Sequence, residues 1–182
     1  MTRPRVQISA EALLHFATGN DNKFLEAQKT LGKLQRINID TIEPQSMEPQ
    51  EITKAKIAQI REHTDKPFFC EDVSLFIEDI NGLPGPFVKY FVARMGADMM
   101  AQYFHASPAR AVCTMGYFDG EQTHIITGET HGRIVQPRGE GWGFNEIFEV
   151  EETQKTLAEL HEINEFSYTH RTRALEQLKE LL

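Results

Sequence analysis

The hydrophobic and polar positions of this chain follow two different periods, which predict a mixture of strands and helices. Short apolar runs bounded by turn residues are typical of strands. Strands are expected over residues 13–17, 36–42, 68–70, 110–118, 122–129 and 147–150. Residues 130–135 extend the fifth strand, and Asp119-Gly120 is expected to turn the fourth strand into the fifth. The strand at 68–70 is expected to stop at Glu71-Asp72.

Apolar residues spaced three or four positions apart predict the helices. Helices are expected over residues 22–34, 51–62, 90–95, 97–104 and 169–182, and loops over 43–50, 81–86 and 137–143. The sequence contains no internal repeat, low-complexity tract or linker. Because strands and helices mix along the chain, we expect an α/β fold with a mixed sheet, in a single domain over residues 1–182.

Composition and charge narrow the class of protein. The chain has 182 residues, of which 40% are hydrophobic and 25% charged, the balance of an ordinary globular domain. It lacks an apolar run of about 18 residues, so we expect no membrane span, and no apolar stretch follows the basic N-terminus as a signal peptide would. Cys70 and Cys113 are far apart, which favours a reducing cytoplasm over a disulfide framework. A net charge of −8 argues against a nucleic-acid partner but permits a local phosphate pocket.

The first segment whose residues suit ligand binding joins the first predicted strand to the first helix. Thr18-Gly19-Asn20 forms a turn there, and Lys23 falls in the first turn of the helix. Free N–H groups at a helix start favour an anion, and a lysine adds a positive charge. Taken alone, an ordinary turn capped by Asn20 explains this stretch better.

Two carboxylates, Glu71 and Asp72, directly follow the apolar strand at 68–70. Carboxylates at the end of a strand can hold Mg²⁺ or orient a water molecule. A solvated strand end explains them about equally well. Further along, residues 82–86 read Gly-Leu-Pro-Gly-Pro and precede Lys89, which could grip a phosphate. The alternative there is a tight turn packed by its own aromatic side chains.

Two later segments combine aromatic, amide and basic side chains. Residues 139–145 are glycine-rich and contain Trp142, Gly143, Phe144 and Asn145, a composition suited to a flat ligand, although tryptophan more often fills a core. Residues 168–173 open the last helix with His170 and Arg171 near its N-terminus. Cations are unfavourable at that end of a helix, which is easier to understand if an anion shares the site. An exposed arginine is the simpler alternative.

The order of these segments along residues 14–173 resembles the inosine/xanthosine triphosphate pyrophosphatase family, also called the Ham1-like family. The Gly-Leu-Pro-Gly-Pro stretch with its following lysine is the most specific part of the resemblance. The other matching elements are Thr18-Gly19-Asn20 with Lys23 and Glu26, Glu48-Pro49 with Glu51-Ile52 and Lys56, Glu71-Asp72, Trp142-Gly143-Phe144-Asn145 with Ile147-Phe148, and Thr169-His170-Arg171.

The resemblance implies an elongated mixed sheet flanked by helices, two lobes with a central nucleotide cleft, and usually a homodimer. It implies Mg²⁺-dependent cleavage of inosine, deoxyinosine or xanthosine triphosphate between the α- and β-phosphates. The implied catalytic residues are Asp72, Glu71 and Lys56. Asp72 and one loop carboxylate are the implied metal ligands; Glu43 and Glu48 both remain open, with Glu48 as the working assignment. The implied substrate-binding residues are Thr18, Gly19, Asn20, Lys23, Lys56, Lys89, Trp142, Gly143, Phe144, Asn145, His170 and Arg171.

The sequence departs from the family pattern at several positions. Glu165 replaces a lysine, and a carboxylate facing a triphosphate would repel it. Asn145 replaces an aspartate, Glu146 a proline and Thr169 a serine. An amide donates as well as accepts hydrogen bonds, so the base preference can differ. Two alternatives to the family activity therefore stay open: a relative recruited to a different or modified nucleotide, and a nucleotide-binding protein with weakened catalysis.

Overall fold

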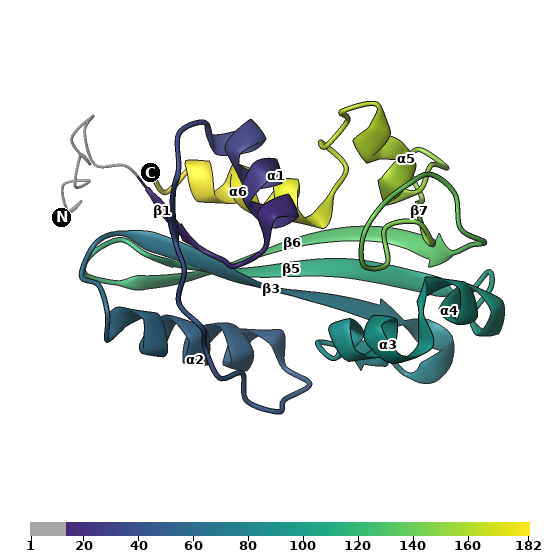
Figure 1. The fold of residues 1–182 in the computed structure, drawn as a ribbon, viewed down its shortest axis with the longest axis horizontal. Helices are drawn as coiled ribbons and strands as arrows, with labels where there is room; N and C mark the ends of the chain where they lie inside the picture. Colours follow the sequence, from purple (N-terminus) through teal and green to yellow (C-terminus); the bar gives the residue numbers. More distant parts are fainter. Residues whose placement is uncertain (1–13) are drawn as a thin grey trace, which may run out of the picture.

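One long mixed β-sheet runs through the molecule, and helices cover both of its faces (Figure 1). The computed structural model describes residues 14–182. The strands are β1 (His15–Ala17), β2 (Gln35–Ile37), β3 (Phe68–Ile77), β4 (Pro84–Gly85), β5 (Pro108–Phe118), β6 (Thr123–Ile134) and β7 (Phe148–Val150). Their order is β2-β1-β3-β5-β6-β7, with β4 paired to β3 outside this path. β1 is parallel to β2 and β3, whereas the other pairs are antiparallel, so the expected mixed sheet is confirmed.

The helices form two groups, one toward each end of the long strands. They are α1 (Asp21–Leu31), α2 (Pro49–Arg61), α3 (Val88–Met95), α4 (Ala97–Tyr103), α5 (Leu157–Glu162) and α6 (His170–Lys179), with a 3₁₀ turn over Glu78–Ile80. In Figure 1, α1 and α6 lie above the sheet and α2 below it at one end, while α5 lies above and α3 and α4 below at the other. These groups correspond to the two expected lobes. Among the described residues, no helix is long and apolar enough to cross a membrane.

β3 is buried on both faces, which explains its nearly continuous apolar sequence. Phe69 packs with Phe16 and Leu175 on the side of α1 and α6. Phe68 packs with Ile60 on the side of α2. Because successive side chains of a strand point to opposite faces, one strand supplies core residues to both layers.

The open edge of β3 is the feature that positions the site. β1 pairs with β3 only at Phe68 and Phe69, and β4 pairs with it only at Leu75 and Phe76. β5 occupies the opposite edge of β3 along its whole length. In the described part of the chain, residues 70–74 of β3 therefore have no strand partner on the side of β1 and β4, and an opening remains between these short strands.

Several predicted element boundaries were wrong. The strand at 68–70 does not stop at Glu71-Asp72, because β5 continues to pair with both residues and carries the ladder on to Ile77. The first helix ends at Leu31 instead of residue 34, because Gly32 adopts φ +80° and closes the helix. The second strand is limited to residues 35–37. Leu13, the predicted first strand residue, lies outside the described residues.

Other predictions agree with the structure, and two elements were missed. The hairpin at Asp119-Gly120 and the extension of its second strand to Ile134 are confirmed. The missed elements are β4 and α5. A Thr-x-x-Glu pattern marks the start of α5, where Thr156 and Glu159 each accept a hydrogen bond from the other's backbone N–H. This capping box was readable in the sequence.

Two glycines allow helices to lie directly on the sheet. A Cβ at Gly128 of β6 would fall 2.1 Å from the carbonyl oxygen of His170 and 2.4 Å from the backbone nitrogen of Ala174, both in α6. A Cβ at Gly116 of β5 would instead meet the Ile57 side chain of α2, with its Cδ1 at 2.1 Å. The backbone of α6 cannot move aside as easily as a side chain can rotate.

We therefore expect Gly128→Ala to lower the free energy of unfolding by about 1–3 kcal/mol, because overpacking displaces α6 from the sheet. Gly116→Ala is the matched comparison, and its loss should be smaller because Ile57 can repack. Urea unfolding of the three proteins measures the difference. Equal losses at the two positions would contradict the close packing of α6 on β6.

Candidate active site

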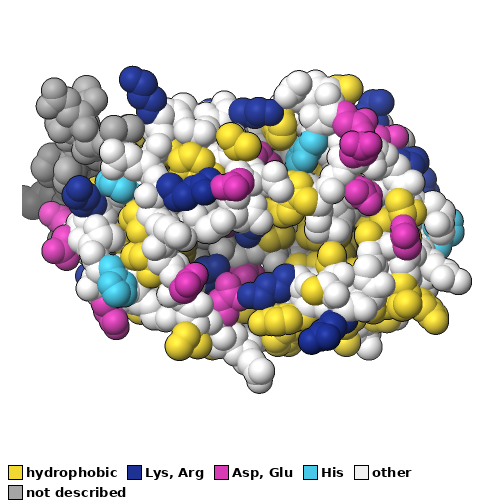
Figure 2. All heavy atoms as spheres, in the orientation of Figure 1, with side chains coloured by type: hydrophobic (Ala, Val, Ile, Leu, Met, Phe, Trp, Pro, Cys, Tyr) yellow, Lys and Arg dark blue, Asp and Glu magenta, His cyan; other side chains and the backbone are white. Residues whose placement is uncertain are grey.

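A cleft of about 510 Å³ lies over the open edge of β3, between the two groups of helices. Figure 2 shows a hollow near the middle of this face, with basic and acidic side chains around it. Its ionisable lining residues are Lys23, Asp40, Glu43, Lys56, Glu71, Asp72 and Lys89, and the other predicted residues that line it are Thr18, Gly19, Asn20, Trp142, Gly143 and Phe144. Predicted segments that lie between residues 18 and 144 therefore meet at one cavity.

The turn from β1 into α1 forms one wall of this cleft. The Asn20 side chain accepts a hydrogen bond from the Lys23 backbone N–H at 3.0 Å and caps α1. The Thr18 hydroxyl accepts from the Asn20 backbone N–H at 3.1 Å. β1 lies between β2 and β3 and is parallel to both. α1 connects β1 to β2 on one face of the sheet, and α2 connects β2 to β3 on the opposite face. Ligands of open α/β sheets bind at such a point, beyond the carboxyl ends of the strands.

Glu71 points to the face of the sheet that carries α1 and α6, where it belongs to a buried ion network. Its carboxylate lies 3.1 Å from Lys23 Nζ and 3.0 Å from Arg171 Nε. Arg171 also forms an ion pair with Glu26, and its side chain is only 2% exposed. Burial alone would raise the pKa of Glu71, but the charges of Arg171 and Lys23 hold that pKa well below its usual range. Glu71 is therefore a permanently charged anchor for two basic side chains.

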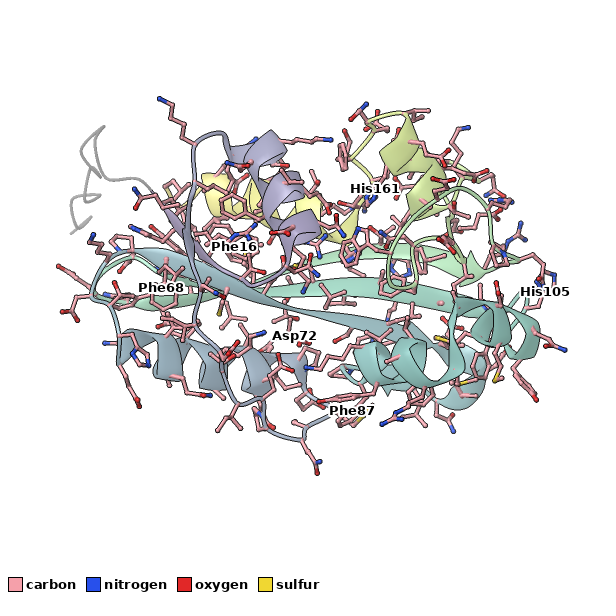
Figure 3. The ribbon with its side chains drawn as sticks, in the orientation of Figure 1. Phe16, Phe68, Asp72, Phe87, His105 and His161 are labelled. Atoms are coloured by element: carbon pink, nitrogen blue, oxygen red, sulfur yellow. The ribbon has the colours of Figure 1, made fainter. Side chains whose placement is uncertain are left out.

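Asp72 points to the opposite face, toward α2, and its environment differs completely. Figure 3 shows it between α2 and α3. Its hydrogen-bond partner is the Ser74 hydroxyl, at 3.3 Å, and within the described residues it has no ion pair within 4 Å. Burial raises the pKa of Asp72 to about 6, although the charges of Lys56 and Lys23 oppose this shift. A carboxylate with a pKa near neutrality is suited to proton transfer.

Glu43 enters the cleft from the loop before α2. Its two carboxylate oxygens lie 3.0 Å from Lys56 Nζ and 2.6 Å from Lys89 Nζ. Burial acts against ionisation, yet the two lysines lower the pKa of Glu43 to about 2. Lys56 also donates to the backbone carbonyl of Glu71 at 2.8 Å, a group on the open edge of β3.

Glu48, the working assignment for the second metal ligand, does not line the cleft. It is the exposed N-cap of α2, five residues beyond Glu43. The proline at position 49 starts the helix and leaves Glu48 on the outer surface. The structure brings Glu43, and not Glu48, next to Lys56 in the cleft.

The residues predicted to surround a base fall into two sets, because Trp142, Gly143 and Phe144 line the cleft whereas the others are enclosed. Phe144 stacks on His170 with ring centroids 6.0 Å apart, and the Arg171 guanidinium carbon lies 5.5 Å from the centre of the Trp142 ring. Asn145, His170 and Arg171 are buried and do not border the open cavity. In the described chain, Asn145 Nδ2, His170 Nδ1 and Arg171 Nη2 have no hydrogen-bond partner. Burial lowers the pKa of His170 to about 3, so its ring is neutral.

Glu165 does not face the cleft. Its carboxylate accepts a hydrogen bond from the Ser167 backbone N–H at 2.9 Å, and it is not a lining residue. The expected repulsion of a phosphate group by Glu165 therefore has no geometric basis. The replacement of the family lysine removes a cation without placing a carboxylate in the pocket.

Glu26 belongs to the site, although sequence reasoning gave it no role. It is 3% exposed and receives a hydrogen bond from the Thr169 hydroxyl at 2.7 Å in addition to its ion pair with Arg171. Glu26 follows Lys23 by three positions, which places both on one side of α1. That spacing was the available signal.

The oxygen donors of the cleft suit a hard divalent cation. Mg²⁺ is usually held by one or two carboxylates together with water and substrate phosphates. Asp72 and Glu43, which both line the cleft, supply such carboxylates. Among the described residues, no group of three His, Cys, Asp or Glu side chains lies close enough together to form a metal site.

Fold and cleft together define an α/β protein with a cleft at the switch point of its sheet, lined by lysines and carboxylates. A model of the Ham1 family matches residues 14–181, and the chain belongs to that family. The inosine triphosphate pyrophosphatase of Kluyveromyces lactis is 36% identical over 92% of this chain and 94% of that protein. The dITP/XTP pyrophosphatase of Methanopyrus kandleri is 35% identical over 91% of this chain and 93% of that protein.

Solved structures agree with this membership. A HAM1 protein from Coxiella burnetii superposes with a TM-score of 0.77 at 25% identity, covering 92% of this chain and 96% of that chain. The Ham1 protein of Staphylococcus aureus gives a TM-score of 0.71 at 20% identity, covering 92% and 96%, and supports the fold alone. The expected family fold is confirmed.

The raised pKa of Asp72 predicts that this residue destabilises the metal-free protein at neutral pH. The pKa changes from an ordinary 3.8 to about 6 on folding, so the folded state binds the proton more tightly. Stability from the protonated form is complete below pH 3.8 and is lost as the pH rises through 6. Asp72→Asn should therefore raise the free energy of unfolding by about 1–3 kcal/mol at pH 7.5, at 1.4 kcal/mol per pKa unit, and by little near pH 4.

Urea unfolding in a chelator at the two pH values measures this effect, with Asp79→Asn as a control for removing one carboxylate elsewhere. A loss of stability at pH 7.5 in Asp72→Asn would show that the carboxylate is stabilised by its neighbours and not strained by burial.

Proposed function

We propose that this protein hydrolyses inosine, deoxyinosine or xanthosine triphosphate to the monophosphate and pyrophosphate, with Mg²⁺. The observation that carries the proposal is a buried Asp72 of raised pKa, set at an open strand edge beside three lysines that line one cleft. The names of the relatives identify the substrate class, because they are inosine triphosphate and dITP/XTP pyrophosphatases.

The cleft offers separate groups for the phosphates and for the attacking water. Lys23, Lys56 and Lys89 bind the phosphate oxygens, together with the turn at Thr18-Gly19-Asn20, and they stabilise the charge that develops on the leaving pyrophosphate. Asp72 accepts a proton from water as the water attacks the α,β-anhydride and the bond to pyrophosphate breaks.

Asp72 and Glu43 are the residues that would hold Mg²⁺. When bound, the cation supplies charge neutralisation at the phosphates and makes a coordinated water easier to deprotonate. Glu71 takes part only indirectly, because its carboxylate is committed to Lys23 and Arg171 and fixes their positions.

Base selection rests on the enclosed polar groups behind Phe144. Arg171 Nη2 is a hydrogen-bond donor without a partner in the described chain, and Asn145 Nδ2 is a second one. A 6-keto oxygen satisfies such donors, whereas a 6-amino group leaves them unpaired in a buried place. Trp142 and Phe144 supply aromatic surface for the purine ring.

We further propose, from the family resemblance, that the protein acts as a cytoplasmic homodimer with no nucleic-acid or membrane partner. The alternative of a nucleotide-binding protein with weakened catalysis was supported mainly by Glu165. Because Glu165 turns away from the cleft, that support is lost. A preference for a different base remains tied to Asn145.

The proposal predicts fast, Mg²⁺-dependent release of pyrophosphate from the three substrates and slow release from adenosine triphosphate. A panel that adds the four common triphosphates and several modified bases, with and without Mg²⁺, measures this preference. Folded Asp72→Asn is the inactive control, since it lacks the proton acceptor. Pyrophosphate release only from a triphosphate with a modified base would favour the alternative of a recruited relative. Turnover by Asp72→Asn would show that Asp72 is not the proton acceptor.

A matched pair of variants decides between the two loop carboxylates. Glu43→Gln should lower kcat/KM by about 100-fold or more, the effect of losing a group near a metal or its ligands. Glu48→Gln removes the same charge five residues away, outside the cleft, and should leave kcat/KM within about twofold. Steady-state kinetics with inosine triphosphate over a range of Mg²⁺ concentrations measures both. A reversed order would restore Glu48 as the functional carboxylate.

A further inference from the structure

The three lysines that line the cleft each form an ion pair with a carboxylate. Lys23 pairs with Glu71, and both oxygens of Glu43 are taken by Lys56 and Lys89. A triphosphate therefore does not enter a set of free cations. Its phosphate groups compete with these carboxylates for the N–H donors of the lysines.

Glu43 is the carboxylate that is placed for such a displacement. It lies in a loop, and its side chain is 27% exposed, whereas that of Glu71 is only 2% exposed and is held by Arg171 as well. Lys56 has a second, fixed contact with the Glu71 backbone carbonyl at 2.8 Å. When a phosphate arrives, Lys56 can stay at the strand edge while Glu43 moves away from it.

Glu43 also connects the two groups of helices across the cleft. Lys56 belongs to α2 and Lys89 to α3, and these helices flank Asp72 in Figure 3. One carboxylate thus links both sides of the opening through contacts of 3.0 and 2.6 Å. The same carboxylate stands with Asp72 among the residues that line the cleft.

We propose that Glu43 is an exchangeable ligand, which holds Lys56 and Lys89 until a triphosphate takes these lysines and then passes to the divalent cation. The identity of the triphosphate rests on the proposed function, whereas the exchange itself is inferred from the ion pairs of Glu43 with Lys56 and Lys89. Triphosphate and cation then assist one another's binding, and such coupling is reciprocal.

The exchange predicts that one substitution has opposite effects with and without metal. Without metal, Glu43 competes with phosphate for the lysines, so Glu43→Gln should bind inorganic tripolyphosphate and the α,β-methylene analogue of inosine triphosphate about fivefold more tightly. With saturating Mg²⁺, the variant lacks a cation ligand and should bind the analogue about fivefold more weakly, a change at the lower end of typical coupling between sites.

Isothermal titration calorimetry in a chelator and in saturating Mg²⁺ measures both effects, with Glu48→Gln as the matched control that should change neither. A role of Glu43 in the fold alone would weaken binding in both conditions. A role as a permanent metal ligand would leave the metal-free affinity unchanged. Either result would overturn the exchange.

A second variant tests the same exchange from the side of the lysines. Lys89→Met frees one oxygen of Glu43, so Mn²⁺ alone should bind about fivefold more tightly, as measured by its electron paramagnetic resonance signal. Lys54→Met removes an equal charge from the exposed side of α2, and it should leave Mn²⁺ affinity unchanged. Equal Mn²⁺ affinities for Lys89→Met and the unaltered protein would contradict the exchange.

These outcomes are separable from failure of the proposed function. Tripolyphosphate carries no base, so the metal-free result does not depend on the purine assignment. Hydrolysis of the expected purine triphosphates without the sign reversal would reject the exchange and keep the function. The sign reversal without hydrolysis would do the opposite.

Discussion

Successive side chains of an extended strand point to opposite faces of a sheet, and Glu71 and Asp72 are separated by this alternation. Had both carboxylates faced the same layer, they would repel each other and compete for one set of cations. Instead Glu71 meets Arg171 and Lys23 in one layer, while Asp72 meets the buried surroundings of α2 in the other. One neighbour becomes a fixed charge and the other a carboxyl group that titrates near neutrality. The division of labour within the site follows from the pleat of β3.

The fixed charge in turn connects distant parts of the chain. Arg171 is brought to Glu71 from a position 100 residues further on, and Glu26 completes the buried group. Breaking one partner out of a buried ionic group leaves an uncompensated charge and typically costs about 3–5 kcal/mol. The network therefore holds α1 and α6 in one arrangement, and with them the turn that carries Asn20 and the enclosed side chain of His170. The positions of the turn at Asn20 and of the His170 side chain depend on the same few contacts.

Much of this arrangement was visible in the sequence, because patterning and order carry it. Apolar periodicity located the long helices and the β5–β6 hairpin, and the family resemblance brought the segments around Thr18, Asp72, Lys89 and Trp142 to one cleft. The local pattern could not show that β3 runs on through two adjacent charges, since that depends on pairing with β5 and on Arg171, 100 residues further along the chain. For the same reason it left Glu43 and Glu48 unresolved, because loop residues are placed by the lysines that meet them in space.

The opening that makes the site is also a place where the sheet gives up hydrogen bonds. β1 and β4 are too short to meet, so the edge of β3 between them lacks a strand, and Lys56 binds the Glu71 carbonyl there instead. A side chain can be exchanged for a ligand, whereas a paired strand cannot. The gap between β1 and β4 therefore leaves room for ammonium and carboxylate groups where strand pairing would otherwise close the cleft. In this protein the cleft that Asp72, Glu43 and three lysines line follows from two short strands that leave part of β3 uncovered.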